Sequence, residues 1–156
     1  MLLLRSILFA ILIPGTVTVT VPCILLVRNP TSIPVWGWIG LVPILFGALV
    51  LIRCIRDFFI TGRGTLAPVE PPAQLVISGL YRYVRNPMYV GVVTMVLGEA
   101  WLFASWPLLI HAAATFMVVH LFVLFHEEPT LRRRFGKSYE YYLRTVPRWW
   151  PRKPRA

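Results

Sequence analysis

The sequence has few charged residues, and those it has are mostly of one sign. Only 14% of its 156 residues are charged, and six acidic residues stand against 16 basic ones, which gives a formal net charge of +10. Hydrophobic residues make up 57% of the chain, and the mean hydropathy is +0.68. An ordinary soluble domain carries about 25% charged residues. The composition therefore argues against a soluble domain and indicates that hydrocarbon surrounds much of the chain.

Cysteine and histidine are too scarce and too scattered to build a disulfide framework or a metal site. Cys23 and Cys54 both fall inside apolar stretches, without a partner at metal-ligand spacing. His111, His120 and His126 follow one another along a single predicted helix, at spacings that do not form a ligand face. We predict no metal, and we interpret both cysteines as packing residues.

Long apolar stretches are what the sequence has in abundance. Four of them approach the roughly 20 residues that a helix needs to cross about 30 Å of hydrocarbon. We therefore predict an all-α, multi-pass membrane bundle of about four transmembrane helices. A cleaved signal peptide is the alternative for the first stretch, but its apolar run is longer than that of a signal. The stretches are residues 2–27, 35–60, 88–104 and 107–125.

These stretches organise the chain as a single integral membrane domain. Only a short turn separates the last two stretches, which predicts a tight hairpin. The four parts are residues 1–60 with the first two membrane helices, 61–87 as a cytosolic loop, 88–125 as the hairpin, and 126–156 as a cytosolic interfacial helix and tail.

Apolar and aromatic residues recur at helical spacing after the hairpin, with basic residues between them. Leu131, Phe135, Tyr139 and Tyr142 share this spacing, which predicts an amphipathic helix lying at the membrane interface. Pro129 suits the first turn of such a helix. Tyrosines in this setting are more often interfacial belt residues than ligand contacts, and the tail tryptophans suit the headgroup layer.

Arginine accounts for 14 of the 16 basic residues, and its distribution predicts the orientation of the helices. The basic residues gather around residues 53–85 and after residue 131, whereas the turns at the other end of the predicted helices carry only Arg28. The positive-inside rule then places both termini and the long loop in the cytoplasm. We expect this basic surface to face anionic lipid headgroups rather than nucleic acid, in a bacterial-type inner membrane.

The hairpin brings two polar clusters together. Equal counting outward from its turn places Arg85 and Asn86 level with the residues just before Glu127 and Glu128. The cytoplasmic end of the hairpin is therefore the predicted site. Glu99 lies near the opposite end, where an acid inside a membrane helix needs a partner. We favour a hydrogen bond from Glu99 to His111, with a proton relay or a substrate ligand as the alternative.

The sequence around these clusters resembles the isoprenylcysteine carboxyl methyltransferase and phospholipid methyltransferase families over residues 79–151. Asn86 stands where many members carry His, which favours hydrogen bonding over proton transfer at that position. The resemblance is carried by Arg85-Asn86-Pro87-Met88-Tyr89-Val90-Gly91, then by Glu127-Glu128, Leu131, Phe135-Gly136, Tyr139 and Tyr142.

The resemblance implies S-adenosylmethionine as the cofactor. Carboxylates would accept from its ribose or ammonium, tyrosine rings would face its cation, and Arg85 would pair with its carboxylate. For an amine acceptor, Glu128 or His126 would remove a proton. The cofactor residues are Tyr81, Arg85, Asn86, Pro87, Tyr89, Gly91, Glu127, Glu128 and Tyr139, and the catalytic ones are Arg85, Glu128 and His126.

The acceptor is expected to be a lipidic or hydrophobic small molecule that enters from the bilayer, with either a carboxylate or an amine as the methylated group. Gly37, Gly40 and Gly47 permit close helix contact within one chain or in a homo-oligomer. Two other functions stay open. One is an NADPH-dependent membrane enone or sterol reductase, whose C-terminal part shows a similar pattern, and the other is a non-catalytic membrane assembly protein.

Overall fold

The computed structural model describes residues 12–61, 75 and 77–152 of the chain. The beginning of the first predicted stretch, most of the loop before residue 75 and the last four residues lie outside this part. The described residues form helices and connections without strands, which confirms the all-α prediction. The elements are η1 (Thr16–Thr20), α2 (Val21–Arg28), η2 (Val35–Gly40), α3 (Leu41–Thr61), η3 (Gly79–Arg82), α4 (Pro87–Leu102), α5 (Trp106–Phe122), η4 (Val123–Glu127), α6 (Glu128–Phe135) and α7 (Lys137–Thr145).

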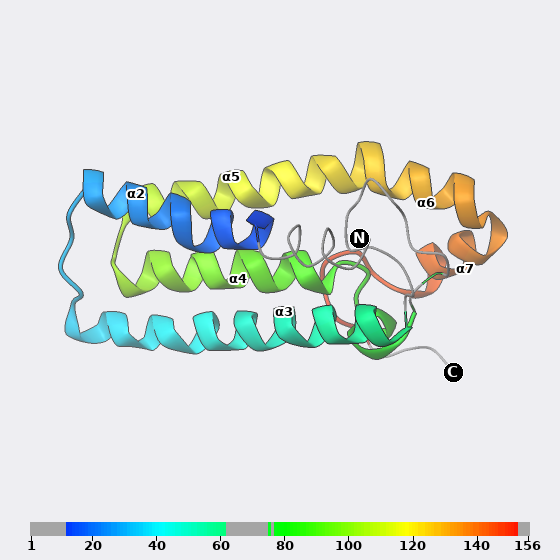
Figure 1. Cartoon of the computed structure of the whole chain (residues 1–156), viewed down its shortest axis with the longest axis horizontal. Coiled ribbons are helices and arrows are strands. Elements are labelled where there is room, and N and C mark those ends of the chain that lie inside the picture. The colour runs from blue at the N-terminus through cyan, green and yellow to red at the C-terminus, as the bar shows by residue number, and fades with distance from the viewer. Residues whose placement is uncertain (1–11, 62–74, 76, 153–156) are drawn as a thin grey trace.

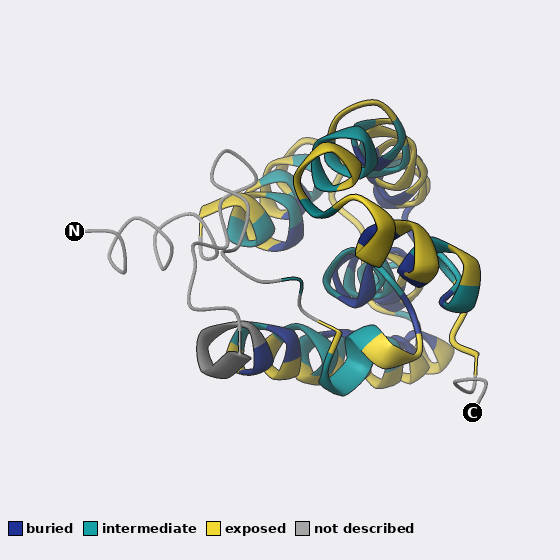
Figure 2. Ribbon diagram, turned by 90° about the vertical axis from the view of Figure 1, so that its right-hand side faces the viewer, coloured by how far each residue is buried: buried dark blue, intermediate teal, exposed yellow. Residues whose placement is uncertain are grey.

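The long helices run side by side (Figure 1). Many of their apolar side chains are exposed. Val35–Asp57 and Trp106–Phe135 are each long and apolar enough to cross a membrane, with a mean hydropathy of 2.3. Leu12–Arg28 and Pro87–Leu102 are shorter apolar helices. Figure 2 looks along the bundle and shows exposed residues mainly on the outward faces of the helices. Such a large apolar surface suits lipid as the surrounding solvent.

Helix α4 lies between α3 and α5, and glycines set its distance from α3. A Cβ on Gly40 would lie 2.5 Å from the carbonyl oxygen of Gly98, and a Cβ on Gly98 would lie 2.8 Å from that of Gly40. One helical heptad away, Gly47 and Gly91 repeat the arrangement. Small residues let two helix backbones approach closely, and here the close contact is made within one chain.

The predicted hairpin turn between α4 and α5 is confirmed. The backbone amide of Ser105 donates to the carbonyl of Ala100 at 3.0 Å, and that of Ala104 donates to Trp101 at 3.1 Å. Ala104 has a positive φ of 46°, and buried Ser105 lies just before α5. Because the turn is this short, the two helices are antiparallel neighbours (Figure 1).

The predicted hydrogen bond between Glu99 and His111 is wrong. His111 Nε2 instead lies 2.9 Å from the backbone carbonyl of Val17, in the first helix. That carbonyl is available to His111 because η1 is a π-helix, in which the Val21 N–H bonds to the carbonyl of Thr16, five residues earlier, and not to that of Val17. The next donor in this pattern is Pro22, which has no N–H. Oε2 of Glu99 is buried without a hydrogen-bond partner among the described residues.

Pro129 lies in the first turn of α6, as predicted, but α6 continues from the preceding helix and is not separate from it. The helix that begins at Trp106 runs on to Phe135, because η4 widens the turn just before the proline, and Glu128 N–H bonds to the Val123 carbonyl. The predicted C-terminal helix is present but divided, since Gly136, with φ of +51°, separates α6 from α7. A positive φ suits glycine, and the chain turns back at this point (Figure 1).

Candidate active site

The segment before α4 begins with a turn that depends on glycine. Gly79 has φ of +58° and opens the short helix η3. A side chain at this position would also collide with the carboxylate of Asp57, which is buried at the end of α3. Asn86 then precedes Pro87, which disfavours a helical conformation at Asn86 and starts α4 at Pro87. The glycine turn and the proline thus fix the path of residues 79–86 from the end of α3 to the first residue of α4.

Two side chains of this region, four residues apart, meet the acidic pair at the end of the hairpin. Arg85 Nη1 lies 2.7 Å from Glu128 Oε1, and both side chains are nearly nine-tenths buried. The Tyr89 hydroxyl donates to Glu127 Oε2 at 3.1 Å. The prediction that the hairpin brings these two polar clusters together is confirmed.

The π-turn η4 coincides with the acidic pair. Glu127 is its last residue, and Glu128 closes it through the hydrogen bond to Val123. In the same pattern the carbonyl of Leu124 would need a donor at Pro129, which has none. The widened turn shifts the phase of the helix at the acidic pair, where it meets Arg85 and Tyr89. Single π-turns inside α-helices occur often at functional sites.

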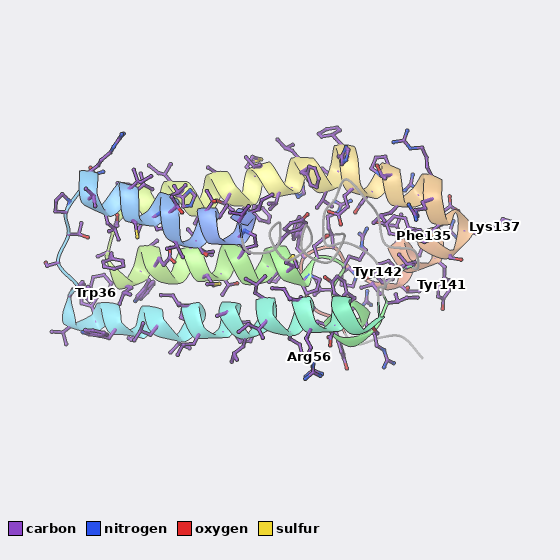
Figure 3. The ribbon with its side chains drawn as sticks, in the orientation of Figure 1. Trp36, Arg56, Phe135, Lys137, Tyr141 and Tyr142 are labelled. Carbon is purple, nitrogen blue, oxygen red and sulfur yellow. The ribbon has the colours of Figure 1, made fainter. Side chains whose placement is uncertain are left out.

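Tyr139 and Tyr142 are buried, so their interpretation as interfacial belt residues is wrong. Only 3% of Tyr139 and 5% of Tyr142 is exposed, because α7 folds back and packs with Leu131 and Phe135 of α6. Figure 3 shows Tyr142 near the end of the bundle, while Lys137 and Tyr141 point outward. The Tyr142 hydroxyl donates to the Tyr81 carbonyl at 2.7 Å and so ties α7 to η3.

Burial governs the ionisation of these phenols. Burial first, and then the negative charge of Glu128, raise the pKa of Tyr139 to about 12, although the Arg85 guanidinium opposes the shift. Burial also raises the pKa of Tyr142 and that of Tyr81. All three hydroxyls therefore stay protonated at neutral pH and can donate hydrogen bonds, and the three rings are uncharged.

Most of the residues predicted for the site lie together, but three do not present side chains to it. His126 is exposed and stacks on Phe122, with ring centroids 5.1 Å apart. Gly91 faces α3 rather than the acidic pair, and Pro87 is fully buried at the start of α4. Contacts join the others to one cluster at the end of the bundle: Tyr81, Arg85, Asn86, Tyr89, Glu127, Glu128 and Tyr139.

Sequence reasoning missed two residues beside this cluster. Arg148 binds Glu128 through two nitrogens, and nothing in the basic tail distinguished it from its neighbours. Asp57 packs against Gly79, and an acid at the end of an apolar helix was a usable signal. Trp149 packs on α5 and donates to His120 Nδ1 at 3.0 Å.

The cluster has the groups that a zwitterionic, cationic ligand needs. Arg85 Nε is buried without a hydrogen-bond partner among the described residues, so it can donate to a carboxylate. The Glu127 carboxylate and the Tyr139 ring can face a cation. The described residues contain no group of three or more acids, cysteines or histidines that could hold a metal.

The sequence matches the model of a known family. A family model described as phospholipid methyltransferase matches residues 35–138, about two thirds of the chain. The matched region contains α3, α4, α5, η4 and α6, and with them Arg85, Tyr89, Glu127 and Glu128. A comparison with the curated proteins found no match.

Proposed function

Because the chain belongs to the phospholipid methyltransferase family, we propose that it transfers a methyl group from S-adenosylmethionine to a lipidic acceptor. The family and the apolar helices make it a membrane methyltransferase. The proposal adds the methyl donor, the class of acceptor and the position of the site at the cytoplasmic face. It rests above all on one observation, the meeting of Arg85 and Tyr89 with Glu128 and Glu127.

That meeting supports a binding site because it joins segments far apart in the chain. The paired residues are 43 and 38 positions apart, and the pairs are largely buried. Keeping charged groups away from water is costly unless they are paired. Stability alone is thus a weak reason for such a cluster, whereas recognition of a charged ligand is a sufficient one.

The donor groups of the cluster fit S-adenosylmethionine. Arg85 Nε, which has no partner among the described residues, would donate to the carboxylate of the cofactor. Glu127 and the ring of Tyr139 would face its positive charges. When bound, the cofactor supplies a methyl carbon already activated by a sulfonium. The residues therefore need mainly to hold donor and acceptor in line, which can supply several kcal/mol of the barrier reduction.

For an amine acceptor, we assign proton removal to Glu127. Glu128 is occupied by Arg85 and by Arg148, and His126 is exposed and stacked on Phe122. Glu127 accepts only the Tyr89 hydroxyl among the hydrogen bonds of the described side chains. A carboxylate acceptor would need no proton removal. Either acceptor would reach the site from the bilayer.

Charge distribution supports a cytoplasmic site. Arg53 and Arg56 lie near the end of α3 that carries the site, and Figure 3 shows Arg56 near that end and Trp36 at the other. Arg132, Arg133 and Arg134 are exposed on α6 at the same end. The positive-inside rule would place this end in the cytoplasm, where anionic headgroups attract basic residues.

The test is calorimetric titration of the full-length protein in detergent with S-adenosylmethionine, and with NADPH in parallel. A double variant, Glu127→Gln and Glu128→Gln, is compared with Glu140→Gln, which changes an exposed acid on α7. We expect the wild type and Glu140→Gln to bind the methyl donor, and the double variant to lose binding and methyl transfer while remaining folded.

Other results would replace the proposal. Binding of NADPH instead of the methyl donor would indicate a reductase. Binding of neither ligand by correctly folded protein would favour a non-catalytic assembly role. Unchanged binding by the folded double variant would refute the site assignment.

A further inference from the structure

The C-terminal segment of residues 146–152 runs beside the segment that precedes α4. The Arg85 amide donates to the Pro147 carbonyl at 2.9 Å, and the Arg152 amide donates to the Tyr83 carbonyl at 3.0 Å. The Asn86 side-chain amide donates to the Arg148 carbonyl at 3.3 Å. Although about 60 residues separate the two segments in sequence, these bonds pair them along the edge of the site.

The side chain of Arg148 forms two parallel hydrogen bonds with the carboxylate of Glu128. Its Nε lies 2.8 Å from Oε1, and its Nη2 lies 2.9 Å from Oε2. This two-point geometry fixes a carboxylate more firmly than one contact does. Oε1 is shared with Arg85 Nη1, at 2.7 Å, so the orientation of Glu128 also determines that of Arg85. The hydrogen bond to Glu128 raises the pKa of Arg148.

Trp149, the next residue, fixes the C-terminal segment to α5. Its indole N–H donates to His120 Nδ1 at 3.0 Å, and its ring lies 5.2 Å from that of Phe116 in an edge-on arrangement. Both partners belong to α5. Arg148 is therefore held between a backbone pairing on one side and a membrane helix on the other, and its side chain has little freedom to leave Glu128.

We propose that Arg148 is a positioning residue for the methyl donor, acting through Glu128 and Arg85. By fixing the Glu128 carboxylate, it holds the Arg85 guanidinium so that Nε remains free for the carboxylate of the cofactor. Arg148 lies beyond the region that the family model matches, which ends at residue 138. The inference rests on the proposed function, because it names how the same site is kept in shape.

The test uses the full-length protein with Arg148→Gln and Arg148→Lys, and with Arg144→Gln as the control. Arg144 is an exposed arginine on α7. We expect Arg148→Gln to raise the KM for S-adenosylmethionine about tenfold or more, the usual consequence of losing charged hydrogen bonds. The kcat at saturating cofactor should change much less. Arg148→Lys keeps the positive charge but cannot form both parallel hydrogen bonds to Glu128. Its KM for S-adenosylmethionine should lie between those of the wild type and Arg148→Gln.

A second measurement separates positioning from general stability. In a protein that already carries Glu128→Gln, the further change Arg148→Gln should cause little additional loss of cofactor affinity, because the two side chains act as one unit. Equal losses in both backgrounds would overturn the proposal. If Arg148→Gln does not fold, Arg148→Lys decides: a raised KM supports the proposal, and an unchanged KM overturns it.

The remaining outcomes are also distinct. Wild-type affinity in folded Arg148→Gln would overturn the role of Arg148 while leaving the proposed function intact. Tighter cofactor binding by that variant would show that Arg148 competes with the ligand, which also overturns the proposal. Failure of the wild type to bind S-adenosylmethionine would overturn the proposed function, and this inference with it.

Discussion

The carbonyl oxygen of Gly91 on α4 lies where the Cβ of a larger residue at Gly47 on α3 would have to be. A Cβ on Gly47 would also lie 2.6 Å from Met95 Cγ, and the Gly91 carbonyl is backbone that a local side-chain movement cannot displace. Because α4 also carries Tyr89, the glycine contact sets the position of a helix that contributes to the site.

We predict that Gly47→Ala destabilises the protein by about 1–3 kcal/mol, the usual cost of overpacking. Gly15→Ala is the matched control, because Gly15 is helical and a Cβ there meets nothing within 4 Å. Thermal unfolding in one detergent compares the two variants. A midpoint for Gly47→Ala at or above that of Gly15→Ala would contradict the structure.

Replacing His111 should leave the Val17 carbonyl without a partner. His111→Ala removes the group 2.9 Å from that oxygen, and an unsatisfied, partly buried carbonyl costs about 1–3 kcal/mol. His111→Gln retains a side-chain N–H donor and should recover part of the loss. The measurement is again thermal unfolding, and equal destabilisation by the two variants would argue against the hydrogen bond.

Gly79→Ala should impair both stability and methyl transfer. The change places a Cβ at positive φ and against the Asp57 carboxylate, so the turn that leads to Tyr81 and Arg85 must move. Gly136→Ala is the control, because Gly136 has a similar φ but open space around it. Gly136 has φ of +51° and ψ of −127°, a combination that side chains with a Cβ rarely adopt. We therefore expect Gly136→Ala to lose about 1–3 kcal/mol from backbone strain alone, whereas Gly79→Ala adds the collision with Asp57 to its own strain.

Activity distinguishes these two glycine variants further. Cofactor affinity should fall in Gly79→Ala, since the segment carrying Arg85 shifts. Equal stability and equal affinity in the two variants would show that the Asp57 contact has no influence on the site.

The Tyr139 phenol should lose its proton at a higher pH than an ordinary tyrosine does. Its pKa of about 12 in the folded protein lies above the ordinary value of 10.0, so the folded state holds this proton more tightly than the unfolded state. The ionisation of Tyr139 leaves the free energy of unfolding unaffected below pH 10 and lowers it as the pH rises from 10 to about 12. Tyr139→Phe should remove a component near pH 12 from the tyrosinate absorbance titration and should lessen the alkaline loss of stability. A titration unaltered by this change would contradict the burial of Tyr139.

The sequence was sufficient for features that depend on local composition. Runs of apolar residues predicted the helices, and the short turn at Ala104 and Ser105 predicted an antiparallel hairpin. Equal counting from that turn was enough to place Arg85 beside the acidic pair, because antiparallel helices of equal rise keep neighbouring residues level. The hydrogen bond from Tyr89 to Glu127 was not predicted by this counting. The residues of the candidate site could be found in this way, together with the resemblance to known methyltransferases.

Helix continuity was predicted wrongly where a proline was taken as a boundary. Pro129 has no N–H and clashes with the preceding turn of an α-helix, so a new helix was expected there. The structure relieves the clash by widening one turn in η4. Whether a chain breaks or widens before a proline depends on what the following residues pack against, which sequence periodicity does not contain.

The helical class, the apolar surface, the hairpin and the meeting of its two polar clusters could all be predicted from the sequence. Each follows from composition or from fixed helical geometry. Three contacts could be found only in the folded structure. Arg148 forms hydrogen bonds with Glu128, Tyr139 and Tyr142 are buried, and His111 bonds to Val17 rather than to Glu99. These contacts join residues whose separation in the chain carries no periodic signal. They depend on how α7, the C-terminal segment and the first helix fold back, and that is set by packing among all the elements together.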